Sequence, residues 1–465
     1  MAAMTVQVAA PYDRHLIREV PLASYDEVST VLDRARDLFH DRRRWLPKYE
    51  RIRILRNFRD LLAEGREGLA RQAAEEGGKP LADSLTEVNR AVNGVDVAIH
   101  ELTRIGGSEI PMELTESSKN HIAYTMMEPA GVVFAVSAFN HPVNLIIHQV
   151  IPAVAAGCPV IVKPAAATPL SCLSLTDMLH QAGLPADWCR AVLCEREVTQ
   201  RVTADSRIAF LSFIGSAKVG WKLRSNLAPG VRCSLEHGGA APVIVEPDAD
   251  IDAMLPGLVK GGYYHAGQVC VSVQRLFVHR KIMPELRDRM TELVRKLRVG
   301  DPLDVATEVG PLIKPAELNR VEGWVEEAVR GGAQLLCGGR RISDTCYEPA
   351  LLLEPPLQSK CSQEEVFGPV VCLYEYDDYL DAVDRANRVP FSFQASVYTA
   401  SLDRALDCVR RLKAKTVLVN EHTAFRVDWM PFGGAEMSGL GTGGIGYAMR
   451  DMCSEKLMII RSGVL

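Results

Sequence analysis

The chain begins with a helical arrangement of apolar residues. Ser24 and Glu27 form a capping box, a pattern that marks the start of a helix. Apolar residues within 28–39 then recur at the spacing of one helix face, and a second helix is predicted over 47–64. Acidic neighbours dilute the arginines of this second helix, so we interpret it as a solvated face and not as a site for a polyanion. The pattern predicts that the first hundred residues are helical.

The pattern changes after Lys119 to short apolar runs. Residues 121–129 alternate between polar and apolar and predict an edge strand. Strand-length runs then alternate with helical segments, which we place at about 145–156 and 170–181. This alternation is typical of βαβ units, in which helices cover both faces of a parallel sheet. A second α/β block follows, and the end of the chain again predicts a strand.

Composition excludes several classes of protein. The 465 residues include 53 Lys and Arg against 58 Asp and Glu, and the net charge of −5 gives no electrostatic reason to bind nucleic acid. The 12 cysteines form no C-x-x-C pair, which argues against a disulfide framework and a zinc site. We therefore expect a cytoplasmic protein without a metal. Polar residues interrupt the most apolar stretch, 129–162, and the N-terminus lacks the pattern of a signal peptide, so we expect no membrane partner.

Two glycine-rich segments compete for a phosphate-binding role. Gly439, Gly441 and Gly444 match G-x-G-x-x-G, but this match follows no strand and opens no βαβ unit, so we interpret it as a turn cluster. Residues 213–220 follow a predicted strand and open a helix. Free backbone N–H groups and the positive end of that helix would accept a pyrophosphate.

Three residues stand out as chemically reactive. Cys270 lies in a polar segment flanked by glycine, unlike Cys158 or Cys194, which we interpret as inert core packing. Glu236 lies between a strand-like run and a double glycine, where it is either a buried base with a raised pKa or a carboxylate in a surface turn. Asn140 is either a loop cap or an oxyanion donor.

Seven short motifs place these residues in a common context. They are FNHP at 139–142, KPAAATP at 163–169, FIGSAKVG at 213–220, LEHGG at 235–239, GQVC at 267–270, EEVFGPV at 364–370 and PFGGAEMSG at 431–439. Each motif is weak alone, but their order and spacing over about 300 residues are specific. On these motifs the chain resembles the aldehyde dehydrogenase superfamily, from about Ser24 to its end.

The resemblance implies an NAD(P)-dependent enzyme that oxidises an aldehyde to a carboxylic acid. Cys270 would attack the aldehyde as a thiolate and form first a thiohemiacetal and then, after loss of a hydride, a thioester. Asn140 and the backbone N–H of Cys270 would hold the oxyanion. Glu236 would activate the water that hydrolyses the thioester, which favours the free acid over a coenzyme A ester as product.

The resemblance also implies which residues bind NAD or NADP. Lys163 would reach the adenosine ribose, and Gly215 and Ser216 the pyrophosphate. Glu365 and Phe367 would contact the nicotinamide ribose.

Two positions depart from the family pattern. Strict NAD users carry a glutamate in the segment KPAE, which binds the ribose hydroxyls and repels a 2′-phosphate. This chain has Ala166 there, so we expect NADP to be accepted. Glu436 stands where PFGG-x-K is commoner, and nothing in the sequence explains it.

Three polar residues are predicted to bind the substrate. Arg426 stands where an aromatic residue is common, His141 follows Asn140, and Arg90 falls where the family's substrate tunnel is lined. Guanidinium groups donate forked hydrogen bonds to tetrahedral oxyanions, and these segments resemble phosphonoacetaldehyde dehydrogenases of phosphonate metabolism. The predicted substrate is phosphonoacetaldehyde or phosphonoformaldehyde. Lactaldehyde, glycolaldehyde, sulfo-aldehydes and phosphorylated aldehydes stay open. In the alternative interpretation, Arg426 pairs with Asp428 or another carboxylate, and His141 only packs the loop.

The implied fold is α/β. A doubly wound NAD(P)-binding domain would span 1–118 and 131–247, and a catalytic domain 248–452. A β-arm of 119–130 and 453–465 would join subunits into a homodimer or homotetramer. Two other classes of protein stay open. One is a catalytically silent structural protein, and the other is a non-redox Cys-dependent hydrolase. Binding of a nicotinamide cofactor would distinguish a dehydrogenase from the hydrolase.

Overall fold

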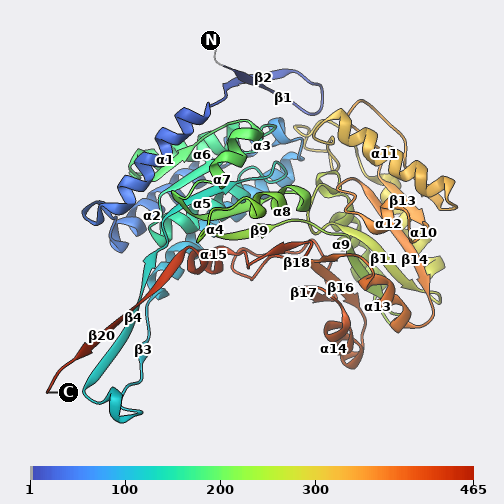
Figure 1. Cartoon of the computed structure of the whole chain (residues 1–465). Helices are drawn as coiled ribbons and strands as arrows, with labels where there is room; N and C mark the ends of the chain where they lie inside the picture. The colour runs from blue at the N-terminus through green and yellow to red at the C-terminus, as the bar shows by residue number, and fades with distance from the viewer. Residues whose placement is uncertain (1–3, 465) are drawn as a thin grey trace.

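Two large sheets form the body of the molecule, and a narrow β-arm projects from it (Figure 1). The computed structural model describes residues 4–464. The first sheet has the order β19-β9-β8-β5-β6-β7, and the second has the order β12-β13-β14-β11-β10-β16-β17. Neighbouring strands are parallel except for the pairs β19–β9 and β12–β13. The expected α/β class is confirmed, with mostly parallel sheets.

The strands of the two sheets are short. The first sheet contains β5 (Val132–Val136), β6 (Val160–Lys163), β7 (Cys189–Ala191), β8 (Ile208–Ile214), β9 (Arg232–Glu236) and β19 (Gly439–Leu440). The second contains β10 (Ala241–Val245), β11 (Val273–His279), β12 (Gln334–Cys337), β13 (Ala350–Leu353), β14 (Val370–Tyr376), β16 (Gln394–Tyr398) and β17 (Thr416–Val419). A separate two-stranded sheet pairs β15 (Phe391–Ser392) with β18 (Ala435–Glu436).

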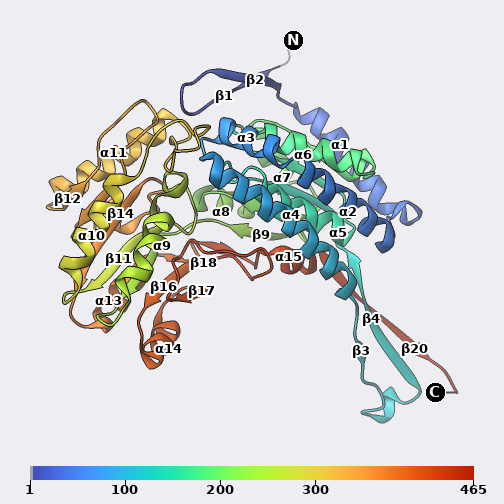
Figure 2. The same ribbon diagram turned by 180° about the vertical axis from the view of Figure 1, so that it is seen from behind.

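Helices cover both faces of the first sheet, because its central strands bury both sets of side chains. In β5, Val133 and Ala135 pack into one hydrophobic cluster, while Val132, Phe134 and Val136 pack into another. The first cluster includes α2 (Lys48–Glu64), α3 (Arg66–Gly77), α4 (Leu81–Arg104), α5 (Asn144–Ala156), α6 (Leu170–Gln181) and α15 (Ile445–Asp451). The second includes α1 (Tyr25–His40), α7 (Arg196–Thr203) and α8 (Ala217–Ser225). Figure 2 shows α2 and α4 on the face turned toward the viewer.

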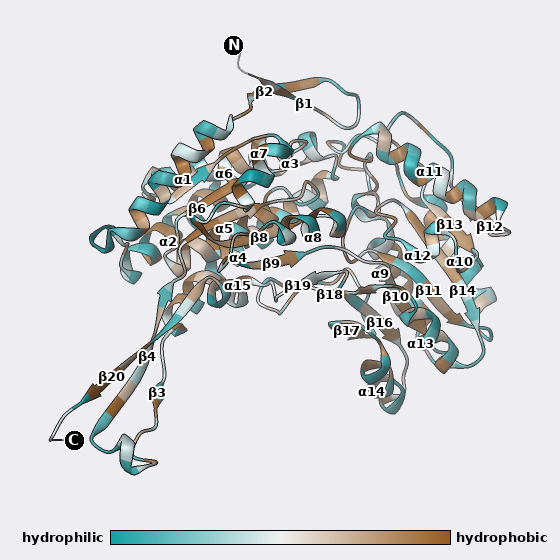
Figure 3. Ribbon diagram, in the orientation of Figure 1, coloured by the Kyte–Doolittle hydropathy of each residue, from teal (hydrophilic) through white to brown (hydrophobic). Residues whose placement is uncertain are grey.

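The second sheet has its own core. The helices around it are α9 (Ile251–Tyr263), α10 (Met283–Lys296), α11 (Pro315–Arg330), α12 (Lys360–Gln363), α13 (Tyr379–Asn387) and α14 (Leu402–Arg411). Figure 3 shows hydrophobic colour along β11 and β14 and mostly hydrophilic colour on α11, as expected for a buried sheet and a helix at the surface. The side chain of Asp250 caps α9 by accepting a hydrogen bond from the Ala253 N–H at 3.0 Å.

The prediction that the first hundred residues are helical is wrong at the start of the chain. β1 (Thr5–Ala9) and β2 (Leu16–Pro21) form an antiparallel hairpin before α1. Val8 and Val20 alternate with polar residues and bury their side chains against Leu170 and Leu193. This alternation is too short to indicate a strand by itself, and the hairpin is stabilised by contacts with residues far along the chain. The capping box of Ser24 and Glu27 is confirmed.

The projecting arm consists of β20 (Cys453–Arg461), β4 (His121–Pro129) and β3 (Glu109–Ile110). Both strands predicted from the sequence are present, but β4 lies between β20 and β3 and is not an edge strand. Since β3 has only two residues, most of that side of β4 stays unpaired within the chain. Leu457 and Ile459 of β20 are exposed.

Within residues 4–464, no helix combines the length and apolar character needed to cross a membrane.

Candidate active site

A cavity of about 780 Å³ lies between the two sheets. Lys163, Gly215 and Glu236 reach it from the carboxyl ends of the parallel strands β6, β8 and β9, the usual place for a ligand in such a sheet. Every predicted site residue except Ala166 lines this cavity. Those lining it are Arg90, Asn140, His141, Lys163, Gly215, Ser216, Glu236, Cys270, Glu365, Phe367 and Arg426.

Cys270 is presented by a strained turn between α9 and β11. His265 and Ala266 have φ values of 50° and 53°, in the left-handed region that side chains disfavour. Gln268 anchors the turn: its side-chain oxygen accepts from the Ile313 N–H at 2.9 Å, and its side-chain nitrogen donates to the Pro311 carbonyl at 3.2 Å. The turn therefore holds Cys270 at the cavity wall, partly buried.

Asn140 lies beside the same turn. Its Nδ2 donates a hydrogen bond to the Gln268 carbonyl at 2.9 Å, and its side chain is buried. An asparagine amide carries two N–H donors, so this contact fixes the amide and leaves a second donor. The structure thus brings Asn140 and Cys270 together across 130 residues of sequence, as the motifs predict.

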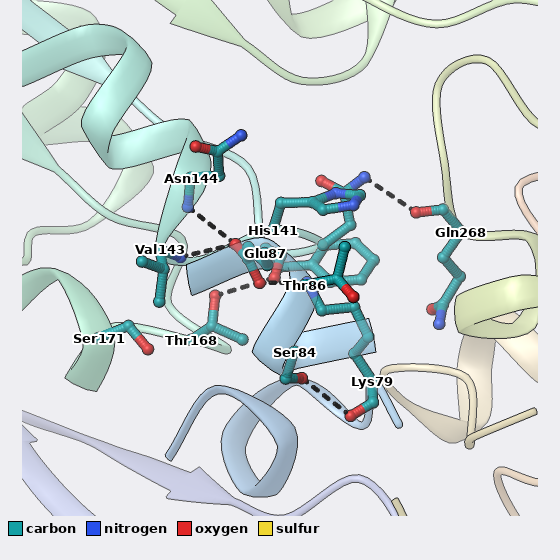
Figure 4. A network of polar contacts seen from close by, with 12 residues as sticks. Lys79, Ser84, Thr86, Glu87, His141, Val143, Asn144, Thr168, Ser171 and Gln268 are labelled. Atoms are coloured by element: carbon teal, nitrogen blue, oxygen red, sulfur yellow. Dashed lines mark hydrogen bonds and ion pairs between the residues drawn. The ribbon is translucent and has the colours of Figure 1, made fainter. Parts of the chain in front are cut away.

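A buried ion pair holds the segment that carries Asn140. Oε1 of Glu87, on α4, accepts hydrogen bonds from the Val143 N–H at 2.9 Å and the Asn144 N–H at 2.8 Å (Figure 4). Its other oxygen pairs with Lys79, and both side chains are almost wholly buried. Glu87 therefore caps the start of α5, directly after Asn140. Sequence analysis missed Glu87 because its place in a helical pattern does not distinguish it from a surface glutamate.

Glu236 ends β9 with a buried carboxylate. Burial raises its pKa, and the nearby Arg426 cation partly opposes that rise. Oε1 of Glu236 has no hydrogen-bond partner within the described residues. Gly443 allows the close packing on the other side, since a Cβ there would lie 3.2 Å from Oε2. Glu236 is therefore buried and is not a carboxylate in a surface turn, while its role as a base stays a prediction.

Burial raises the pKa of the Cys270 thiol well above its ordinary value. The Glu236 carboxylate raises it further, and the Arg426 cation acts in the opposite direction. The ionisation of Cys270 therefore depends on the charges of both Glu236 and Arg426.

Arg426 is held on three sides. Its guanidinium lies 3.6 Å from the centre of the Phe432 ring, and one terminal nitrogen lies 3.3 Å from His148 Nδ1. The other terminal nitrogen, NH1, lies 3.9 Å from Glu236 Oε1, beyond hydrogen-bond distance. Nε is buried without a hydrogen-bond partner in the described part of the chain. Arg426 thus faces a carboxylate, as the alternative interpretation allowed, but this carboxylate is Glu236 and the contact is long.

Asp428 binds Arg90 and not Arg426. It accepts from Arg90 at 2.8 and 3.2 Å, from His148 Nε2 at 2.8 Å and from the Asn144 side chain at 3.2 Å. Burial alone would raise the pKa of Asp428, but the His148 hydrogen bond and the Arg90 cation outweigh it and hold that pKa well below its usual range. The charge of Arg90 is therefore largely balanced, whereas Arg426 keeps free donors in the cavity.

Two histidines of this region are neutral at pH 7. Burial lowers the pKa of His148 to about 4, so its Nε2–H donates to Asp428 and its Nδ1 accepts from Arg426. Burial also lowers the pKa of His141 well below its ordinary value, and its Nε2 lies 3.4 Å from the Tyr264 hydroxyl. His141 therefore brings a polar group to the cavity but no positive charge.

The other part of the cavity fits a nicotinamide dinucleotide. Glu365 has a buried oxygen with no hydrogen-bond partner within residues 4–464, and burial raises the pKa of this carboxyl to about 8. Such a group is suited to a ribose hydroxyl. A Cβ at position 238 would overlap the Glu365 carboxylate, so Gly238 leaves room for this carboxylate to lie where it does.

One backbone N–H of the predicted phosphate-binding segment is already used, while the contacts of Gly215 and Ser216 with a pyrophosphate stay a prediction. The Gly215 N–H is not free, because it donates to the Glu236 carbonyl at 3.0 Å. Ser216 and the start of α8 still line the cavity, as does Lys163. Ala166 is exposed outside the cavity, next to Ala165 in its wall. Gly439, Gly441 and Gly444 all have positive φ and lie outside the cavity wall, but only Gly441 and Gly444 lie in irregular chain, because Gly439 belongs to β19 and pairs with Glu236 of β9.

Comparisons with known proteins agree with this geometry. The model of the aldehyde dehydrogenase family matches residues 1–458. A 3-sulfolactaldehyde dehydrogenase of Priestia aryabhattai is 34% identical over 460 residues, which cover 98% of this chain and 95% of that protein. The NADP(+)-dependent succinate-semialdehyde dehydrogenase of Escherichia coli K12 is 33% identical, with 98% and 94% covered.

Solved structures are equally similar. Aldehyde dehydrogenase 21 of Physcomitrella patens, in complex with its reaction product succinate, superposes with a TM-score of 0.96 at 34% identity and covers 100% of this chain and 96% of its own. A glyceraldehyde-3-phosphate dehydrogenase of Methanocaldococcus jannaschii complexed with NADP gives a TM-score of 0.94 at 30% identity, with 99% and 100% covered.

Proposed function

The chain belongs to the aldehyde dehydrogenase family and uses NAD or NADP, and from this premise we propose that it oxidises a short anionic aldehyde, foremost a phosphono-aldehyde. One observation carries the proposal: the Arg426 cation lines the cavity that contains Cys270, and its NH1 lies 3.9 Å from Glu236 Oε1, too far for a hydrogen bond that would occupy its donors. A guanidinium in this state stabilises an anionic group and donates forked hydrogen bonds to its oxygens. Two relatives named for 3-sulfolactaldehyde and glyceraldehyde 3-phosphate, and one whose solved structure contains its reaction product succinate, support an anionic substrate class.

We propose that Cys270 is the nucleophile. Its thiolate forms a bond to the aldehyde carbon, and the carbonyl oxygen becomes an oxyanion. Asn140 Nδ2 and the Cys270 backbone N–H donate to that oxygen, and one such donor contributes on the order of 3 kcal/mol in the transition state. The anchored amide of Asn140 needs little reorganisation to act in this way.

The bound nicotinamide supplies the acceptor for the hydride that leaves the former aldehyde carbon. Cys270 then carries a thioester. Glu236 takes a proton from a water molecule, the hydroxide oxygen bonds to the thioester carbon, and the carbon–sulfur bond breaks to return the Cys270 thiolate. A carboxylate with a pKa raised by burial is a stronger base than an exposed one, so its environment suits this role.

The proposal is tested by a panel of aldehydes with NAD and NADP. We expect kcat/KM for phosphonoacetaldehyde to exceed that for propanal by about 100-fold, roughly 2.7 kcal/mol of transition-state binding. The panel also includes three other anionic aldehydes and one neutral hydroxy-aldehyde, so that their kcat/KM values can be ranked. The anions are sulfoacetaldehyde, glyceraldehyde 3-phosphate and succinate semialdehyde, and the neutral compound is lactaldehyde. Arg426→Gln is expected to remove most of the advantage. A flat profile, or propanal in front, would contradict the anionic substrate and leave the aldehyde dehydrogenase unaffected.

We also propose that NADP is accepted, since Ala166 adds no carboxylate near the adenosine ribose.

The arm of β4 and β20 is proposed to join subunits, because its exposed apolar residues and unpaired strand edge suit a partner chain. The domain boundaries stated from the sequence remain a prediction.

Glu87 is expected to act on activity through Asn140. Glu87→Gln keeps a side-chain acceptor but leaves Lys79 buried without its counter-ion, which costs about 3–5 kcal/mol of stability. We expect kcat to fall about ten- to a hundredfold with KM little changed, because small displacements of a positioned group have costs of this size. Steady-state kinetics and thermal unfolding measure the two effects.

A double-mutant cycle separates positioning from general instability. Adding Glu87→Gln to Asn140→Ala is expected to reduce kcat little further, since the group that Glu87 positions is already gone. Lys79→Met combined with Glu87→Gln removes the unpaired charge and serves as the stability control. An equal loss of kcat in the Asn140→Ala background would show that Glu87 acts elsewhere.

A further inference from the structure

We propose that Arg426 couples binding of the substrate's anionic group to the strength of Glu236 as a base. In the free site the Arg426 cation faces the Glu236 carboxylate. An anionic group bound to Arg426 neutralises part of the positive charge that acts on Glu236. The Glu236 carboxylate then becomes a stronger base and accepts a proton from water more readily. This inference rests on the proposed anionic substrate and adds a link between its recognition and hydrolysis of the acyl-enzyme.

The first observation is the geometry of the pair. Arg426 NH1 and Glu236 Oε1 are 3.9 Å apart, and the two side chains are 9% and 10% exposed. They interact as charges, because the distance is too long for a hydrogen bond. Bulk water screens a buried pair weakly, so a charge added beside Arg426 is felt by Glu236. Glu236 Oε1 and Arg426 Nε are fully buried and lack a hydrogen-bond partner within the described residues, and the 3.9 Å contact with Glu236 leaves NH1 without a hydrogen bond to it.

The second observation is that Arg426 is anchored by contacts that do not involve Glu236. His148 Nδ1 accepts from one terminal nitrogen at 3.3 Å, and the Phe432 ring lies against the guanidinium face. Asp428 fixes His148 from behind through Nε2 at 2.8 Å. An incoming anion therefore meets an oriented guanidinium whose free donors face the cavity.

The third observation concerns the other charges around Glu236. Arg90 also lines the cavity, but Asp428 already balances its charge. Cys270 faces Glu236 from the turn before β11, and Glu365 acts on Cys270 from the cofactor side. His148 on α5 is neutral, because burial lowers its pKa to about 4, and it accepts a hydrogen bond from Arg426. Within residues 4–464, Arg426 is the basic side chain in ion-pair range of Glu236.

The coupling acts in the hydrolysis step. Oxidation changes only the carbonyl end of the substrate, so the anionic group stays on Arg426 while the thioester is attached to Cys270. Water gives its proton to Glu236, its oxygen bonds to the acyl carbon, and the sulfur leaves as the Cys270 thiolate. A neutral acyl group leaves the Arg426 cation directed at Glu236, which favours the ionised carboxylate and makes it a weaker base.

The sign of the expected pH effect follows. A nearby cation lowers the pKa of a carboxyl by about one to three units, and an anion bound to that cation cancels part of this effect. Hydrolysis requires ionised Glu236 and therefore increases with pH. Its midpoint is expected about one pH unit higher for a phosphonoacetyl enzyme than for a propionyl enzyme, with a faster plateau.

The test follows hydrolysis of the acyl-enzyme in single turnovers from pH 5 to 9, with phosphonoacetaldehyde and with propanal. In Arg426→Gln, the midpoint for the propionyl enzyme is expected to rise to about that of the wild-type phosphonoacetyl enzyme. Arg280→Gln, which removes an exposed arginine paired with Asp377, is the matched control and should change neither midpoint. Equal midpoints for the two acyl groups in the wild type would overturn the coupling.

A second measurement needs no variant. Methylphosphonate added to the propionyl enzyme supplies the anion separately and is expected to raise the midpoint toward the phosphonoacetyl value. An unchanged midpoint at saturating methylphosphonate would count against the coupling. Failure of the substrate proposal looks different: phosphonoacetaldehyde then gains no kcat/KM over propanal, while the propanal midpoint still shifts in Arg426→Gln if the coupling holds.

Discussion

Cys270→Ala is expected to lower aldehyde oxidation by about 10⁴-fold or more, the loss typical when a covalent nucleophile is removed. Without the sulfur, no thiohemiacetal forms and the aldehyde carbon cannot release a hydride. The cavity wall described here contains no other cysteine to replace it. Formation of NADH or NADPH, followed by absorbance with the best aldehyde of the panel, measures the loss.

The control for this variant is cofactor binding. Cys270 is not among the residues proposed to bind the dinucleotide, so NADP should raise the unfolding temperature of Cys270→Ala about as much as that of the wild type. If the variant keeps more than about a hundredth of the wild-type rate, the chemistry does not depend on this thiol. Loss of the NADP effect on unfolding would instead show that the substitution damaged the site.

Glu236→Gln should separate the two halves of the reaction. We expect a burst of reduced cofactor equal to one product per active site, followed by turnover about 10²- to 10³-fold slower than in the wild type, because glutamine cannot take a proton from water. The amide has almost the size of the carboxylate, so the packing against Gly443 should survive. Rapid-mixing absorbance measures both phases.

The burst also reports on the thiol. The Glu236 carboxylate raises the pKa of Cys270, so its removal should lower that pKa and shift the pH midpoint of the burst downward. The thiolate is the reactive form, and the burst at neutral pH should therefore be no slower than in the wild type. A variant without any burst would assign Glu236 to acylation, in conflict with the proposed role.

The sequence predicted the parts of the site that parallel sheets bring together. Lys163, Gly215 and Glu236 each follow or end a predicted strand, and the carboxyl ends of neighbouring parallel strands meet at one edge. Family motifs supplied Asn140 and Cys270, which the structure places beside one turn. The bounds of α6 agree with the prediction from apolar spacing, although the start of this helix is also capped by a distant carboxylate, that of Glu76, which accepts from the Leu170 and Ser171 N–H groups at 2.8 Å.

The parts that escaped prediction depend on pairings over long distances in the sequence. Arg90 and Asp428 are separated by 338 positions, and nothing near either residue indicates the other. His148 and Glu87 lie within helical patterns, where a polar residue reads as ordinary surface until the fold places it against a partner. The neutral state of His141 depends on burial, which the motif does not encode.

The central claim is that an anionic aldehyde becomes a thioester on Cys270. Its most direct test is mass spectrometry of Glu236→Gln mixed with NADP and phosphonoacetaldehyde and digested under conditions that preserve thioesters. We predict that the protein gains one phosphonoacetyl group and that the modified peptide contains Cys270. An unmodified protein after a full burst of NADPH, or an acyl group on a different cysteine, would contradict the account.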